Sequence, residues 1–128
     1  MSDKLFSLLE LSYSPYSNFR VSSIVVMKDG SEFSGVNIEN ASYGASICAE
    51  RVAILKAVSS GYRQGDFDTL YVMCDSKDIV PSCFLCRQMI SEFFDPNNEI
   101  ILMNNNKEEK RYLVKDMCPV PFDSTYLK

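Results

Sequence analysis

Two short runs of the sequence contain residue types that can bind a metal ion and move a proton. The first extends from Cys48 to Glu50 (CAE) and the second from Cys83 to Cys86 (CFLC). On a helix, Cys83 and Cys86 would share one face, because residues three apart are neighbours. Three thiolates with a fourth position open are the ligand set of a catalytic zinc site, whereas a structural site uses four protein ligands. The pattern therefore predicts one Zn²⁺ per chain, bound by Cys48, Cys83 and Cys86.

Glu50 is the candidate for proton transfer. Both runs fall where a helix is expected to begin, and a helix N-terminus lowers the pKa of a thiol. No earlier helical turn stands in the way there, so Cys48 and Glu50 can border one pocket. A carboxylate in that place can take a proton from an activated water molecule and pass it on. Taken alone, the CFLC run is equally compatible with a structural, redox or coincidental origin. A Glu in the first turn of a helix usually does no more than interact with the helix dipole. Taken together, the two runs favour the zinc site.

The composition excludes several other kinds of chemistry. The 128 residues fit a single domain spanning 1–128. The chain has no histidine, which rules out Ser-His-Asp and Cys-His catalysis and leaves cysteine and carboxylate as ligands for a transition metal. Its five cysteines are an odd number and are unevenly spaced, which favours a reducing compartment over a secreted disulfide framework. We therefore expect a cytoplasmic protein.

Charge and hydropathy also limit the expected partners. The formal net charge of -4 argues against a nucleic-acid partner, because polynucleotide binders usually carry a basic surface. The first apolar patch, residues 5–11, is interrupted by polar residues and is too short for a signal sequence or a membrane span. We therefore expect neither nucleic acid nor a membrane, and a small neutral substrate fits the composition better.

The pattern of hydrophobic residues predicts the elements that must position the two reactive runs. Helical spacing covers residues 3–14, 46–60 and 84–94, and strand-like runs cover 21–27, 32–37, 69–74, 99–103 and 111–114. The order α-β-β-α-β-α-β-β contains two β-α-β crossovers, which imply parallel strand pairs with helices packed on the sheet. We therefore expect an α/β fold with a mixed sheet of about five strands. The reactive runs lie at the starts of the second and third helices.

The sequence resembles the small, homotetrameric type of cytidine deaminase. The likeness extends from about Tyr13 to Phe122 and is most specific at residues 15–21 (PYSNFRV), 35–44 (GVNIENASYG), 47–51 (ICAER) and 86–88 (CRQ). It implies a three-layer α-β-α fold of the cytidine deaminase type. It also implies zinc-dependent hydrolytic deamination of cytidine and deoxycytidine in pyrimidine salvage, with Glu50 as the proton shuttle.

The resemblance further implies which groups meet the nucleoside. Asn37 and Glu39 match the pair that hydrogen-bonds the ribose hydroxyls, and Phe19 matches the aromatic side chain against the base. The backbone around Ala49, and the carbonyls just before Cys83, match groups that read the pyrimidine edge. An Asn and a Glu are a reasonable donor and acceptor pair for a vicinal diol.

Three further residues match family positions that act across subunits. Ala41 and Tyr43 lie where the family's loop contacts nucleoside bound in a neighbouring subunit. Phe122 lies where a C-terminal Phe of another subunit closes the pocket. The resemblance thus implies a homotetramer whose pockets are shared between subunits.

Two arginines lie next to the cysteines in the sequence. Three thiolates around a divalent zinc ion leave a formal charge of -1, which weakens the activation of water. We expect Arg51, Arg87 or both to hydrogen-bond the ligand sulfurs and offset that charge. The alternative for either residue is a surface ion pair.

The loop before the third helix departs from the family pattern. The family usually reads Ser-Pro-Cys-Gly-x-Cys, whereas this chain has Pro81, Ser82, Cys83 and Phe84 in the first four places. The departure affects the geometry that reads the base more than it affects zinc binding. Two alternatives therefore stay open. One is a related zinc deaminase for another amino-substituted nucleoside or nucleotide, and the other is a catalytically silent zinc-binding homologue.

Overall fold

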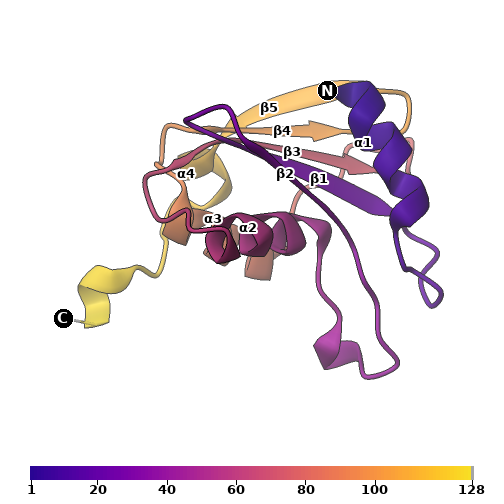
Figure 1. Cartoon of the computed structure of the whole chain (residues 1–128), viewed down its shortest axis with the longest axis horizontal. Coiled ribbons are helices and arrows are strands. Elements are labelled where there is room, and N and C mark those ends of the chain that lie inside the picture. The colour runs from indigo at the N-terminus through magenta and orange to yellow at the C-terminus, as the bar shows by residue number, and fades with distance from the viewer. Residues whose placement is uncertain (128) are drawn as a thin grey trace.

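A single five-stranded sheet forms the centre of the protein, seen here in a computed structural model that describes residues 1–127 (Figure 1). The strand order is β2-β1-β3-β4-β5. Strand β1 pairs antiparallel with β2 and β3, β3 pairs parallel with β4, and β4 pairs antiparallel with β5. The sheet is therefore mixed, as the sequence predicted. The strand bounds are β1 Val21–Met27, β2 Glu32–Val36, β3 Phe67–Cys74, β4 Glu99–Met103 and β5 Glu109–Leu113.

Helices cover both faces of this sheet (Figure 1). Helix α1 (Ser2–Leu8) lies on one face, and α2 (Ala49–Ser59), α3 (Phe84–Phe93) and the short α4 (Val114–Met117) lie on the other. The strands supply both apolar cores, because successive side chains of a strand point to opposite faces. In β1, for example, Ile24 packs under α1 while Val25 packs against α2 and α3. The predicted three-layer α-β-α arrangement is confirmed.

Several elements begin or end at other residues than the sequence pattern predicted. The helix expected over 46–60 begins at Ala49, because two backbone hydrogen bonds of 2.9 Å between Ile38 and Ile47 hold the preceding segment extended. The helix expected over 3–14 is α-helical only to Leu8 and ends in a 3₁₀ turn at Leu9–Leu11. Val114 was expected to end the last strand, and instead it begins α4.

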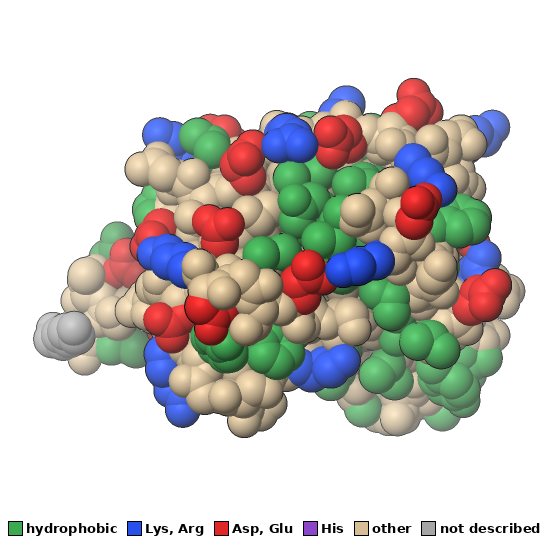
Figure 2. Space-filling view, turned by 45° about the horizontal axis from the view of Figure 1, so that its top comes forward, with side chains coloured by type: hydrophobic (Ala, Val, Ile, Leu, Met, Phe, Trp, Pro, Cys, Tyr) green, Lys and Arg blue, Asp and Glu red, His purple; other side chains and the backbone are tan. Residues whose placement is uncertain are grey.

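The outer surface carries both signs of charge. Figure 2 shows lysine and arginine side chains lying next to aspartate and glutamate side chains over the face turned to the viewer, with apolar side chains between them. Within residues 1–127, no helix combines the length and the apolar character that crossing a membrane requires.

Gly35 in β2 allows α2 to pack with its backbone directly on the sheet. A Cβ atom at this position would lie only 2.6 Å from the carbonyl oxygen of Ala49 and 2.6 Å from the amide nitrogen of Ala53. Both contacts are with backbone atoms, which cannot rotate away. The close approach seats the first turns of α2, and with them Glu50, against the sheet.

We expect Gly35→Ala to destabilise the fold by about 1–3 kcal/mol, because the added methyl group forces α2 away from β2. Urea unfolding followed by circular dichroism measures the change. Gly44→Ala is the matched control, because a Cβ atom at Gly44 meets nothing within 4 Å and its φ is not positive. Equal stability of the two variants would contradict this account of the packing.

Candidate active site

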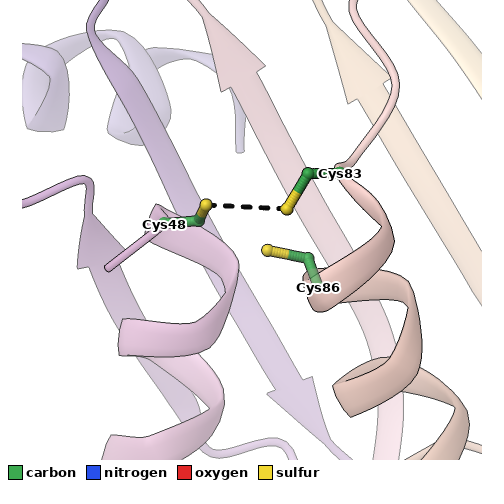
Figure 3. Close-up of side chains that lie close together, drawn as sticks. All are labelled: Cys48, Cys83 and Cys86. Carbon is green, nitrogen blue, oxygen red and sulfur yellow. Dashed lines mark hydrogen bonds between the residues drawn. The ribbon is translucent and has the colours of Figure 1, made fainter. Parts of the chain in front are cut away.

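The three cysteines come together because two helices begin at the same end of the sheet. Cys48 is the N-cap of α2 and Cys83 is the N-cap of α3, each with extended backbone. Cys86 follows in the first turn of α3. Figure 3 shows all three side chains directed into the space between the two helix starts.

The geometry of the three sulfurs fits a tetrahedral metal ion. The Sγ atoms of Cys48, Cys83 and Cys86 all lie within 4.8 Å of one another. Those of Cys48 and Cys83 are 3.7 Å apart. Two sulfurs bound to one zinc at about 2.3 Å in tetrahedral geometry would be separated by about 3.8 Å. The donor set therefore fits zinc, with three protein ligands and a fourth position left for water or substrate.

The thiols interact strongly with one another. Contact with the Cys86 thiol, helped by Arg51, lowers the pKa of Cys48 well below its usual value, and the same contact with Cys48 raises the pKa of Cys86. The Nη2 atom of Arg51 donates to the Cys48 sulfur over 3.7 Å. A thiolate is the form that binds metal, so the site is prepared for a cation. The expected contact between Arg51 and a ligand sulfur is present.

Arg87 hydrogen-bonds two backbone carbonyl groups and not the ligand sulfurs, contrary to the expectation from the sequence. Its Nε donates to the carbonyl oxygen of Ser82 at 2.8 Å, and its Nη1 donates to that of Met117 at 3.2 Å. Its guanidinium also lies over the ring of Phe84, 4.4 Å from the centroid. Within the described residues it makes no hydrogen bond to a cysteine. The Arg87 guanidinium instead links the loop before α3 to the end of α4.

Glu50 is a buried carboxyl group next to the cysteines. It lies in the first turn of α2, and the residue is only 4% exposed. Burial raises the pKa of its carboxyl above the usual value. A raised pKa suits a group that must accept and return a proton near neutral pH.

A cavity of about 250 Å³ joins Glu50 to Cys48 and Cys83, two of the three clustered cysteines. Its walls come from the ends of β1, β2 and β3, the start of α2 and the loop before α3. Its lining residues are Phe19, Val21, Asn37, Cys48, Ala49, Glu50, Val72, Cys74, Val80, Pro81, Ser82 and Cys83. The sequence placed Phe19, Asn37, Ala49 and Glu50 at one site with the cysteines, and the structure brings them together.

Asn37 reaches the cavity with most of its hydrogen-bonding capacity already used. Its Oδ1 accepts from the backbone amide of Val21 at 2.9 Å and from the Ser12 hydroxyl at 2.5 Å, and its Nδ2 donates to the Phe19 carbonyl at 2.8 Å. An amide nitrogen carries two protons, so one donor remains for a ligand. The same bonds fix the carbonyl of Phe19 and the start of β1.

Glu39 lies in a neighbouring hollow instead of this cavity. Its carboxylate accepts hydrogen bonds from the backbone amides of Tyr16 and Ser17, at 2.9 and 3.1 Å, and from the Ser17 hydroxyl. The Ser17 hydroxyl lowers the pKa of Glu39. These bonds hold the charged carboxylate close to the entry of the loop that carries Phe19.

The remaining three expected contacts lie outside this chain's cavity. Ala41 and Tyr43 are exposed on the loop that leads into the 3₁₀ turn Tyr43–Ala45. Phe122 is also exposed, stacks on Tyr126 with ring centroids 5.7 Å apart, and is tied to α3 by a bond from Gln88 to its carbonyl. Both segments project from the body of the molecule (Figure 1).

Sequence reasoning treated Cys74 as a small apolar residue and assigned no catalytic or binding role to its side chain or to that of Ser82, although both line the cavity. Cys74, at the end of β3, is buried, and its burial raises the pKa of its thiol to about 12. Ser82 is buried next to Glu50. The exchanged order of Pro81 and Ser82 drew attention to the loop, but it gave no indication that the serine side chain turns inward.

The fold and the site together define an α/β protein in which three clustered cysteines can hold a metal ion beside a buried carboxyl group. Residues 2–110 match the family described as the cytidine and deoxycytidylate deaminase zinc-binding region. The chain is 42% identical over 113 residues to cytidine deaminase of Halalkalibacterium halodurans, which covers 88% of this chain and 84% of that protein. The crystal structure of cytidine deaminase from Burkholderia pseudomallei is similar, with a TM-score of 0.86, 35% identity, and coverage of 95% and 99% of the two chains.

A relative named for a different activity is also similar. Blasticidin-S deaminase of Bacillus cereus is 31% identical over 110 residues, which is 80% of this chain and 76% of that protein. The family description names zinc binding, and the cluster of Cys48, Cys83 and Cys86 is positioned to hold such an ion. The chain belongs to the cytidine and deoxycytidylate deaminase family.

We expect Arg51→Gln to lower turnover or zinc affinity by about 10- to 100-fold, because groups that hydrogen-bond metal ligands have effects of that size. Zinc affinity is measured by competition with a chromogenic chelator, and turnover by loss of the substrate spectrum. Arg111→Gln removes a surface arginine paired with Glu99 and Glu109 and should leave both quantities unchanged. Parent-like values for Arg51→Gln would show that the contact with Cys48 is incidental.

Proposed function

We propose that the chain catalyses the hydrolytic deamination of cytidine and deoxycytidine to the corresponding uridines. The observation that carries the proposal is the buried Glu50 carboxyl in a cavity shared with Cys48 and Cys83. The named activity of the Halalkalibacterium halodurans and Burkholderia pseudomallei relatives supports the same reaction. Cytidine is neutral and polar, which suits a cavity with one free amide donor, an aromatic ring and no cluster of basic side chains.

The site residues divide the reaction between them. Zinc held by the three cysteines would activate water as a nucleophile at neutral pH. Glu50 accepts a proton from the attacking water and places it on N3 of the base, while oxygen bonds to C4. Glu50 then carries the second proton to the exocyclic nitrogen, which leaves as ammonia. The overall reaction consumes one cytidine and one water molecule and yields one uridine and one ammonia molecule.

The other cavity residues bind and orient the nucleoside. Phe19 presents its ring to the base, and the backbone around Ala49 faces the pyrimidine edge. Asn37 has one Nδ2 proton left for a ribose hydroxyl, since its other bonds are internal. The second ribose contact, by Glu39, stays a prediction, because its carboxylate lines the neighbouring hollow and is bound there by the amides of Tyr16 and Ser17.

An ultraviolet assay of purified, zinc-replete protein tests the proposal. Cytidine and deoxycytidine should lose their absorbance with release of equal amounts of ammonia, while deoxycytidylate and a cytosine-containing oligonucleotide should react far more slowly. Turnover of the nucleotide or the oligonucleotide alone would overturn the proposal. Bound zinc with no turnover of any of these substrates would indicate a silent homologue.

A second candidate is deamination of an aminonucleoside antibiotic. The likeness to Blasticidin-S deaminase of Bacillus cereus, together with the altered loop at Pro81 and Ser82, favours testing it. The same assay with blasticidin S decides between the two substrates, because it gives the ratio of kcat/KM for the antibiotic to kcat/KM for cytidine. A ratio in favour of the antibiotic would replace cytidine as the substrate.

We also propose a cytoplasmic homotetramer that serves pyrimidine salvage, with sites completed by neighbouring subunits. The support is the exposure of Tyr43 and Phe122, which are 78% and 56% exposed on segments that project from the body (Figure 1). Aromatic side chains exposed to this extent mark interaction surfaces when they gather with other apolar groups. Sedimentation equilibrium should give four times the 14.5 kDa chain mass, and a monomer would contradict the proposal.

A further inference from the structure

Ser82 is the last residue before Cys83, and its side chain lies in the catalytic cavity. The residue is only 4% exposed and lines the cavity with Glu50 and Cys48. Among residues 1–127, its hydroxyl oxygen has no hydrogen-bond partner. A buried polar group without a partner is unfavourable and uncommon. Such a group is best explained by a partner that it meets during function.

The backbone of Ser82 is held in place, so only its side chain is free to adjust. Its carbonyl oxygen accepts from Nε of Arg87 at 2.8 Å, and the same guanidinium is anchored on Met117 at 3.2 Å. The Ser82 side chain can still rotate about its own bonds. The hydroxyl proton of a serine rotates to point at a nearby acceptor. The hydroxyl can therefore form a hydrogen bond without moving Cys83.

The Glu50 carboxyl is the charged acceptor that shares the cavity with this hydroxyl. Both residues are only 4% exposed, and both line the cavity of about 250 Å³. An ionised carboxyl group accepts hydrogen bonds with both of its oxygens. No hydrogen bond to the hydroxyl is formed among residues 1–127, so the contact requires the Ser82 side chain to rotate.

We propose that Ser82 is a positioning residue, which donates a hydrogen bond to the Glu50 carboxylate and holds it in line with the atoms between which it moves protons. The inference rests on the proposed deamination. The family pattern that the sequence resembles has proline at this place, and proline has no hydroxyl group. The hydrogen bond is therefore a feature of this chain.

The test compares Ser82→Ala and Ser82→Thr in the zinc-replete protein. Ser82→Ala should lower kcat about tenfold, the effect of losing a hydrogen bond to a charged group, with KM within about twofold of the parent. Affinity for the product uridine and zinc content should not change, and the melting temperature should be the same or higher, because an unpartnered buried hydroxyl is removed. Ser82→Thr keeps the hydroxyl and should restore most of the turnover. Ser91→Ala, the same substitution on α3 outside the cavity, should behave like the parent.

Each other outcome has a definite meaning. An unchanged kcat in Ser82→Ala overturns the inference, as does a raised KM with kcat unchanged, which would place the hydroxyl on the substrate. Equal losses in Ser82→Ala and Ser82→Thr overturn it in favour of packing. Absence of turnover in the parent refutes the proposed function itself, and is seen before any variant is compared.

Discussion

Glu50→Gln is expected to bind zinc and fold like the parent while losing about 10²- to 10⁴-fold in kcat. The amide has nearly the shape of the carboxyl group but can neither accept nor return the proton that the reaction moves. Glu50 is not one of the three sulfur ligands, so the metal should stay. Turnover of cytidine and metal analysis on the same sample measure the two effects together.

The stability of this variant provides an independent check. Burial raises the pKa of Glu50, which means that its ionised form is disfavoured in the folded state. The penalty applies at pH values above the pKa of the unfolded chain, where the unfolded carboxyl is charged. At neutral pH, Glu50→Gln should therefore melt at the same temperature as the parent or higher. Turnover at the parent rate would show that another group carries the proton.

Cys86→Ala should remove the zinc, abolish turnover and lower the stability of the fold. Cys86 is fully buried between the two helix starts and contributes both a sulfur ligand and core packing. Loss of a metal that binds only the folded state costs about 3–4 kcal/mol when the metal is in 100- to 1,000-fold excess over its dissociation constant. Metal analysis, turnover and the free energy of unfolding in urea measure the three effects.

Cys118→Ala is the matched control for this experiment. Cys118 is half-buried at the end of α4 and is not part of the sulfur cluster. Its replacement should leave one zinc ion per chain and parent-like turnover. Equal zinc content in Cys86→Ala and Cys118→Ala would contradict the ligand set. Unfolding of the parent with a strong chelator should show the part of the loss that is due to the metal, and Cys86→Ala should be less stable still because it also loses core packing.

The order of elements was predictable because it depends on patterns that are local in the sequence. Runs such as Val21–Met27 and Glu99–Met103 consist mostly of β-branched or apolar residues, and the structure confirms both as strands. Element ends were less predictable, because contacts between distant residues decide them. The start of α2 at Ala49, for example, depends on pairing between Ile38 and Ile47, which no local pattern reveals.

The site was predictable where residue type alone restricts the chemistry. With no histidine in the chain, the cysteines were the candidate ligands, and the structure brings Cys48, Cys83 and Cys86 together. The role of Arg87 was not predictable. It is one residue from Cys86 in the sequence, but the direction of its side chain depends on the fold around Ser82 and Met117. The inward side chain of Ser82 escaped prediction for the same reason.

The contact between Gly35 and α2 has a consequence for how the protein opens. No side-chain layer separates β2 from the backbone at Ala49 and Ala53, so this part of the helix cannot fray while the sheet remains intact. Regions of this kind exchange their amide protons only through global unfolding, whereas mobile segments exchange through small local openings. The helix turn that carries Glu50 should therefore stay on the sheet until the sheet itself opens, although the first amides of α2 have no acceptor within the helix. On heating, catalysis should be lost with the fold and not before it.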